Sequence, residues 1–125
     1  MFKDTKAFSG FAAPDIDPLR AFYGDTLGIA VTEEYGMLTL HLEGGKRPTL
    51  IYPKPDHEPA NYTILNFDVE DIDATVDALA ERGVEFEKYG ADFGQDERGI
   101  ARGEGPPIAW FKDPAGNILS VLQES

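Results

Sequence analysis

The fold is decided by a stretch that occurs twice, as "FSGFAAPDIDPLRAFYGDTLGIAV" at residues 8–31 and "ILNFDVEDIDATVDALAERGVEFE" at residues 64–87. Each copy runs from an apolar segment through Asp-Ile-Asp into a segment whose apolar residues fall at helical spacing. A glycine and a further apolar segment then follow in both copies. This shared order favours an internal repeat over two unrelated helix starts. We expect two copies packed about a pseudo-twofold axis, each covering the apolar face of the other.

The spacing predicts helices near residues 17–27 and 73–82. In the first, Asp17 is placed to cap and Pro18 falls in the first turn, where its missing N–H costs nothing. In the second, Asp73 is placed to cap. Gly28 and Gly83 are placed to end the two helices in a left-handed conformation. The predicted apolar stripes are Leu19, Phe22, Tyr23 and Leu27 in the first helix and Ile72, Val76 and Leu79 in the second.

Three strands are predicted after each helix, with alternating apolar residues in several of them. They are "GIAVTEE" (28–34), "MLTLHLE" (37–43) and "PTLIYP" (48–53), then "VEFEKY" (84–89), "PPIAWFK" (106–112) and "NILSVLQ" (117–123). The turn "DPAG" separates the last two. The sequence thus predicts an α+β fold of two βαβββ modules, about 6–54 and 61–123, within a single domain spanning 1–125. The proline-rich "YPKPDHEPAN" (52–61) joins them.

One segment, "GADFGQDERGIARGEGPP" at residues 90–107, has no counterpart in the first half. A loop of this length within a compact domain is usually functional or mobile. We therefore treat it as a candidate lid carrying Arg98 and Arg102, with disorder as the alternative.

Composition excludes several classes of function. The 125 residues carry a formal net charge of −12, and a chain this acidic is a poor candidate for binding nucleic acid. The absence of cysteine excludes disulfides and thiolate chemistry. No apolar run approaches the ~20 residues of a membrane span, so we predict no membrane partner. The N-terminal "MFKDTKAFSG" has no long apolar region of a signal peptide, which favours the cytoplasm.

Three segments carry a resemblance to a known family. "PDIDPLRAFYGDTLGI" (14–29), "FDVEDIDATVDAL" (67–79) and "FKDPAGNILSVLQ" (111–123) resemble signatures of the vicinal oxygen chelate superfamily, the glyoxalase/bleomycin resistance/dioxygenase proteins. The resemblance implies that the paired modules form a U-shaped mixed sheet around a cavity. It also implies a homodimer, the assembly common in that family.

The resemblance locates the positions at which the metal enzymes of the family hold their ion. By position these are Phe8, Ile64 and Ser120, and divalent metals prefer imidazole or carboxylate donors to such side chains. The strand "PTLIYP", which holds the fourth position, contains no histidine or acid. We therefore predict no metal and no other cofactor. Of the two histidines, His41 reads as a structural strand residue and His57 as part of a solvated "DHE" loop.

Strand alternation and the resemblance together predict an apolar and aromatic inner wall with few polar groups, the usual composition of a small-molecule pocket. The same side chains would equally serve to fill the core. The predicted ligand-binding residues are Phe8, Tyr52, Ile64, Asn66, Arg98, Arg102, Trp110 and Ser120.

Three functions remain open at this stage. The first is a metal-free protein of the glyoxalase/bleomycin resistance type that binds, and by binding sequesters, a small aromatic or apolar molecule. The alternative is a metal-independent isomerase or lyase acting on a small oxygenated metabolite, which would need an acid–base pair in the cavity. A conventional metal enzyme of the family is disfavoured by the replaced ligands.

Overall fold

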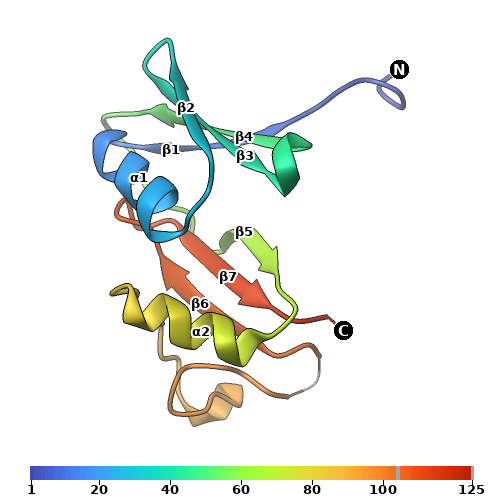
Figure 1. Cartoon of the computed structure of the whole chain (residues 1–125), viewed down its shortest axis with the longest axis vertical. Coiled ribbons are helices and arrows are strands. Elements are labelled where there is room, and N and C mark those ends of the chain that lie inside the picture. The colour runs from blue at the N-terminus through green and yellow to red at the C-terminus, as the bar shows by residue number, and fades with distance from the viewer. Residues whose placement is uncertain (104, 125) are drawn as a thin grey trace. The chain divides into compact units, whose positions relative to one another are not determined.

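The structure, a computed structural model, describes residues 1–103 and 105–124. The chain divides into two compact units, Met1–Glu58 and Pro59–Ser125, each with its own sheet and α-helix (Figure 1). The first unit has a four-stranded sheet and the second a three-stranded one. The predicted α+β fold class is therefore confirmed.

The first unit joins a four-stranded sheet to a helical segment, in which the Tyr23 ring lies 6.0 Å from the ring of Phe11 in the first strand. Its elements are β1 (Ser9–Ala13), α1 (Asp17–Ala21), a π-helical turn (Phe22–Thr26), β2 (Val31–Glu34), β3 (Met37–Leu42), a 3-10 turn (Glu43–Gly45) and β4 (Arg47–Pro53). The strand order is β1-β4-β3-β2, with β1 parallel to β4 and the other pairs antiparallel. Leu38 and Leu40 of β3 and Ile51 of β4 are fully buried, as are Leu19 and Tyr23 of the helical segment.

The second unit repeats this order with one strand fewer. Its elements are β5 (Thr63–Asp68), α2 (Ile72–Glu81), a 3-10 turn (Ala91–Phe93), β6 (Ile108–Lys112) and β7 (Ile118–Leu122). β7 lies between β5, to which it is parallel, and β6, to which it is antiparallel. Ile72, Val76 and Leu79 are the buried residues of α2, as the apolar stripe predicted.

Neither predicted aspartate is the helix cap: the N-cap of α2 is Asp71, and the N-cap of α1 is Ile16, which makes no side-chain cap bond. The first aspartate accepts the backbone amide in each half: Asp15 Oδ1 accepts from Asp17 N at 3.0 Å, and Asp71 Oδ1 accepts from Ala74 N at 3.0 Å. The second aspartate instead pairs with arginine, as Asp17 does with Arg20 at 2.9 Å. The helices begin early enough that Asp17 and Asp73 lie within their first turns, where a carboxylate favours the N-terminal end of the dipole.

The predicted strand "VEFEKY" is reduced to a single bridge between Phe86 and Phe111. The Gln95 side chain takes the backbone bonds that a strand would otherwise make. Its Oε1 accepts from Tyr89 N at 2.5 Å and Gly90 N at 3.0 Å, and its Nε2 donates to Glu87 O at 3.0 Å. Because these groups are satisfied by a side chain, the chain leaves the sheet after Glu87.

The turn between β6 and β7 is confirmed and is built around two buried residues. Asp113 Oδ1 accepts from Ala115 N at 2.9 Å and Asn117 N at 3.0 Å, while Oδ2 accepts from Asn117 Nδ2 at 2.9 Å. Gly116 has a φ of 85°, which a residue with a side chain rarely adopts. This turn sets the register in which Trp110 lies opposite Ser120.

Across residues 1–103 and 105–124, no helix has both the length and the apolar character that a membrane crossing requires.

Candidate functional site

The sheet of the second unit has two distinct faces. One carries Ala109, Phe111, Leu119 and Val121, all buried, and we call it the helix face. α2 packs on it next to β7 (Figure 1). The Gln123 side chain, which follows Leu119 and Val121 in alternation, accepts from the first amide of α2, Ile72 N, at 2.9 Å.

The opposite face, which we call the Ser120 face, brings three predicted site residues into one row. In the strand register Asn66 lies opposite Ser120, and Ser120 lies opposite Trp110. The Ser120 hydroxyl is fully buried and donates to Asn66 Oδ1 at 2.5 Å. Asn66 is exposed and Trp110 is half-buried. The row therefore offers an indole and a primary amide oriented by a buried hydroxyl.

An aromatic cluster of Tyr89, Phe93 and Trp110 extends this row. The rings of Tyr89 and Trp110 meet edge to face at 5.5 Å, and those of Tyr89 and Phe93 at 6.0 Å. Tyr89 is 43% exposed and Phe93 65% exposed, which is unusual for large hydrophobic side chains. Sequence reasoning missed Tyr89 and Phe93 because it placed the first in a strand and the second in a lid of unknown conformation.

Ile64 was predicted as a site residue because strand alternation would place it on the same face as Asn66, but β5 is irregular at this residue. The pairing of β5 with β7 shifts register between Thr63 and Leu65, so that Asn66 but not Ile64 is paired with a residue of the Ser120 row. Such an irregularity of register re-aims side chains in a way that period-2 counting cannot foresee. The part played by Ile64 in binding stays a prediction.

Phe8 and Tyr52 belong to the first unit. Phe8 precedes β1 and is 67% exposed. Tyr52 lies on β4 opposite Ala12 of β1 and is 40% exposed. Their place in a ligand site also stays a prediction.

Arg98 and Arg102 pair with α2, the helix that packs on the helix face of the sheet. Arg98 contacts Asp73 and lies 3.0 Å from Asp77, both on α2. Arg102 lies 2.5 Å from the same Asp73. The structure thus does not bring these arginines together with Asn66, Ser120 and Trp110.

The ion pairs shift the titration of their members. Hydrogen bonding from Arg98 holds the pKa of Asp73 below its ordinary value, with Arg102 adding to the effect. Burial pushes the pKa of Asp96 upward, but the amides of Ile100 and Arg98 and the guanidinium of Arg102 outweigh it and lower the pKa. Both carboxylates are therefore ionised near neutral pH.

The residues at the positions of the family's metal ligands do not fit a divalent ion. Phe8 and Ile64 carry no donor atom, and the Ser120 hydroxyl is engaged with Asn66. Over residues 1–103 and 105–124, no three histidine or acidic side chains are grouped so as to hold an ion. His41 Nε2 lies 2.7 Å from Thr32 Oγ1, and His57 Nε2 is buried with no hydrogen-bond partner.

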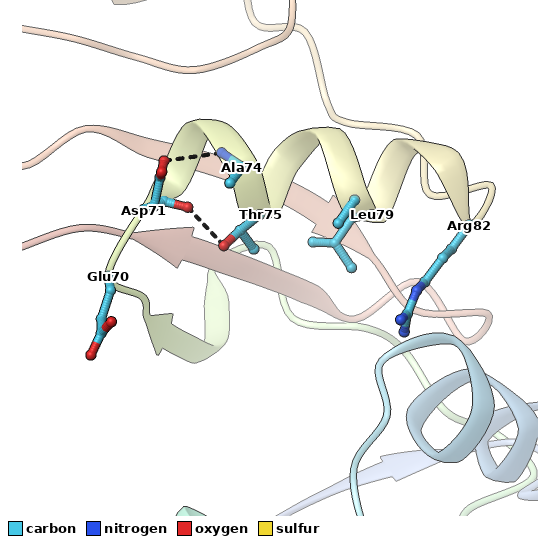
Figure 2. Close-up of a pocket in the computed structure, with 7 residues that line it drawn as sticks. Glu70, Asp71, Ala74, Thr75, Leu79 and Arg82 are labelled. Atoms are coloured by element: carbon cyan, nitrogen blue, oxygen red, sulfur yellow. Dashed lines mark hydrogen bonds between the residues drawn. The ribbon is translucent and has the colours of Figure 1, made fainter.

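An open pocket of about 440 Å³ lies along a third side of α2 (Figure 2). Figure 2 shows Thr75 and Arg82 on this side, with Asp71 Oδ1 accepting from Ala74 N at the start of the helix. At 3.6 residues per turn, this side differs from the one that carries Asp73 and pairs with the arginines. The lining residues are Glu70, Asp71, Ala74, Thr75, Ala78, Leu79 and Arg82.

Comparison with solved structures shows that the fold is shared by proteins of low sequence identity. An antibiotic-binding protein from Streptomyces sp. CB03234 is 22% identical, with a TM-score of 0.69 over 98% of each chain. A superfamily member from Sphaerobacter thermophilus DSM 20745 is 23% identical, with a TM-score of 0.73 over 96% of this chain and 98% of that one. The fosfomycin resistance protein FosX from Mesorhizobium loti is 11% identical, with a TM-score of 0.64 over 98% of this chain and 93% of its own.

At the level of sequence, comparison with curated proteins finds no match. The model of the Glyoxalase/Bleomycin resistance protein/Dioxygenase superfamily matches residues 8–121, which is nearly the whole chain. The chain belongs to the glyoxalase/bleomycin resistance protein/dioxygenase superfamily.

Proposed function

We propose that this protein binds a small organic molecule, in the manner of a resistance or sequestering protein, without using a metal ion. The observation that carries the proposal is the row of Asn66, Ser120 and Trp110, an aromatic wall with an oriented amide. Two structures that share the fold are named as an antibiotic-binding protein and a fosfomycin resistance protein, which supports the same class of function.

The chemistry of the row indicates what the ligand offers. An indole contributes about 0.5–1.5 kcal/mol beyond area burial when it meets another aromatic ring edge to face or offset. Because Asn66 Oδ1 accepts from Ser120, the Nδ2 end of the amide is the end left to donate. We therefore propose a ligand with a planar apolar or aromatic body and a carbonyl or ether oxygen that accepts from Asn66.

The charges favour a neutral or cationic ligand over an anionic one. Arg98 and Arg102 are paired with Asp73, Asp77 and Asp96, so they are committed to α2 and its loop. The net charge of −12 sets up a field that repels anions.

The metal-independent isomerase or lyase is supported less well. It requires a poised acid–base pair beside the substrate, and the row consists of an amide, a hydroxyl and an indole. Lys112, two residues after Trp110, carries a charge, but its ammonium group lies 3.3 Å from the Glu87 carboxylate. Each of these two charges is therefore neutralised by the other.

Trp110 fluorescence tests the proposal directly, because Trp110 is the only tryptophan in the chain. Aromatic antibiotics and planar dyes are titrated into protein treated with chelator. We expect saturable quenching by at least one neutral or cationic compound. Replacing Asn66 by Leu should weaken that binding about tenfold, as expected for one lost hydrogen bond in a desolvated site.

Tyr35→Phe, at an exposed position of the first unit, serves as the control that leaves affinity unchanged. Binding that appears only after a divalent metal is added would overturn the metal-free proposal. A complete absence of saturable quenching across the panel would overturn the binding function itself.

A further inference from the structure

The loop that follows Glu87 presents two aromatic side chains next to the candidate site. The Tyr89 ring packs edge to face on Trp110, and the Phe93 ring packs on Tyr89 in turn. The Phe93 side chain is 65% exposed although its neighbours in the cluster are partly covered. An exposed aromatic surface continuous with a site residue is typical of a recognition surface.

Gln95 holds this loop in one conformation. Besides its bonds to Tyr89, Gly90 and Glu87, its Nε2 donates to Gly99 O at 3.0 Å. One side chain thus closes the loop at both ends. Since the amide oxygen accepts twice and the amide nitrogen donates twice, a replacement that lacks either end leaves backbone groups without partners.

Asp96 and Ile100 anchor the distal half of the loop. Asp96 Oδ1 accepts from Arg98 N at 2.9 Å and Ile100 N at 3.0 Å, and the Ile100 side chain is fully buried. Gly99 has a φ of 93°, and a Cβ added at this position would lie 3.3 Å from Phe86 Cβ. The position therefore has no room for a larger residue. The loop is therefore docked on the second unit.

Two arginines of the loop tie it to α2. Arg98 contacts Asp73 and lies 3.0 Å from Asp77, while Arg102 lies 2.5 Å from Asp73 and 3.5 Å from Asp96. These ion pairs commit the guanidinium groups to α2 and to Asp96 of the loop. A shared Asp73 makes the two arginines one network rather than isolated surface pairs, which individually contribute little.

We propose that residues 88–103 form a docked wall of the ligand site, in which Tyr89 and Phe93 contact the ligand and Arg98 and Arg102 are positioning residues. The inference rests on the proposed function and gives the arginines a role other than ligand contact. According to this proposal, one part of the ligand lies on Trp110 and a second aromatic or planar part contacts Phe93.

The docking role is tested on the protein without ligand. The double variant Arg98→Gln/Arg102→Gln should raise amide hydrogen exchange across residues 88–103 by about tenfold and change the near-ultraviolet signal of Trp110. The matched control is Arg20→Gln, which removes an arginine with two ion-pair partners, Asp17 and Glu33, in the first unit. Unchanged exchange in the double variant would overturn the positioning role.

The contact role is tested with a named probe, the planar cation thioflavin T, followed by quenching of Trp110. Phe93→Ala should raise the dissociation constant roughly fivefold while leaving exchange in the loop unchanged, as for loss of an aromatic contact of about 1 kcal/mol. Phe2→Ala, which removes an exposed ring from the first unit, is the control. The Arg98→Gln/Arg102→Gln variant should also weaken the binding of thioflavin T. Arg98→Lys/Arg102→Lys should recover part of the lost affinity because it keeps both charges.

The outcomes separate this inference from the proposed function. Because Trp110→Phe removes the only tryptophan, binding of thioflavin T to this variant is measured by isothermal titration calorimetry. Binding that Trp110→Phe weakens but Phe93→Ala does not would overturn the wall while leaving the proposed function intact. If the unaltered protein binds neither thioflavin T nor any compound of the wider panel saturably, both the wall and the proposed binding function are overturned. In that case the exchange data still decide whether the arginines hold the loop.

Discussion

At the scale of single residues, the polar side chains that matter most are those that satisfy backbone groups. Asp113, Asp71 and Gln95 each accept from amides that would otherwise be left without partners. The cost of losing such a side chain depends on burial, since an exposed amide turns to water and a buried one does not. Asp113 is only 5% exposed and Asp71 is exposed, so their removal should differ in effect.

Asp113→Ala is expected to lower the free energy of unfolding by about 3 kcal/mol, because two backbone amides and one side-chain amide lose a buried acceptor. Urea denaturation followed by circular dichroism measures this change. Asp92→Ala, at an exposed position, should stay within about 0.5 kcal/mol of the unaltered protein. Equal midpoints for the two variants would show that the turn does not depend on this side chain.

Tyr35→Asn is expected to stabilise the protein by about 0.5–1 kcal/mol. Tyr35 and Gly36 form the two-residue turn between β2 and β3, with φ values of 55° and 75°. Two positive φ values are typical of the turn that favours Asn-Gly, and the Tyr35 side chain is 93% exposed. Thermal unfolding shows whether the change in stability is positive. Tyr62→Asn, at an exposed tyrosine outside the turn, is the control. A lower unfolding midpoint for Tyr35→Asn than for the unaltered protein would contradict the prediction.

At the scale of elements, α2 has three sides, and each makes a different kind of contact. Ile72, Val76 and Leu79 meet the sheet, Asp73 and Asp77 hold the arginines of the loop, and Thr75 lies on the side of the open pocket. The helical period of 3.6 residues makes this division possible within ten residues. The helix thereby links the core of the second unit to the loop that carries Tyr89 and Phe93.

The loop is expected to loosen in acid, and only there. The folded pKa of Asp73 lies below its ordinary value, so its ion pairs contribute fully above the unfolded pKa of about 3.9 and are lost as pH falls through the folded one. The groups facing Asp73 are Arg98 and Arg102, with Asp77 and Asp96 sharing those arginines. The near-ultraviolet signal of the aromatic cluster should stay constant from pH 7 to about 5 and change below about 4.

Asp73→Asn is the matched control for this titration, because it keeps the shape of the side chain and removes the charge. It should remove the part of the acid transition that Asp73 contributes, so that the near-ultraviolet signal already differs from that of the unaltered protein at pH 7 and changes less below about pH 4. A transition near neutral pH in the unaltered protein would contradict the assignment to these carboxylates.

At the scale of the whole molecule, the exposed aromatic residues favour association. Phe8, Tyr62 and Phe93 are each 65% exposed or more, and removing such rings from water would favour association. We propose that the protein is a homodimer. Light scattering should give a mass near twice 13.7 kDa, and a monomer at high micromolar concentration would contradict it.

Metal content is also a property of the whole molecule. We expect the purified protein to carry no stoichiometric zinc, nickel, iron or manganese, because the ligand positions hold Phe8, Ile64 and Ser120. Elemental analysis after treatment with chelator measures this. About one ion per chain retained under those conditions would reverse the metal-free proposal.

The sequence by itself determined the α+β class, both helical segments, the glycines that end them and five of the seven strands to within a few residues, along with β1 and β5 as the apolar segments that open the two repeats. These features follow from local periodicity and from backbone conformations that only glycine adopts readily. The turn at Asp113 and the grouping of Asn66 with Ser120 could be predicted for the same reason, since a strand alternates with a fixed period.

Only the tertiary structure decided how polar groups far apart in the sequence satisfy one another. The strand "VEFEKY" was lost because Gln95 competes for its backbone bonds. Asp71 caps the helix, and Asp73 instead pairs with Arg98 and Arg102, which come from a loop more than twenty residues away. The shift of register near Ile64 likewise depends on β7. Local patterns record the preferences of a segment, whereas hydrogen bonds and ion pairs across the fold depend on which partners the packed core brings within reach.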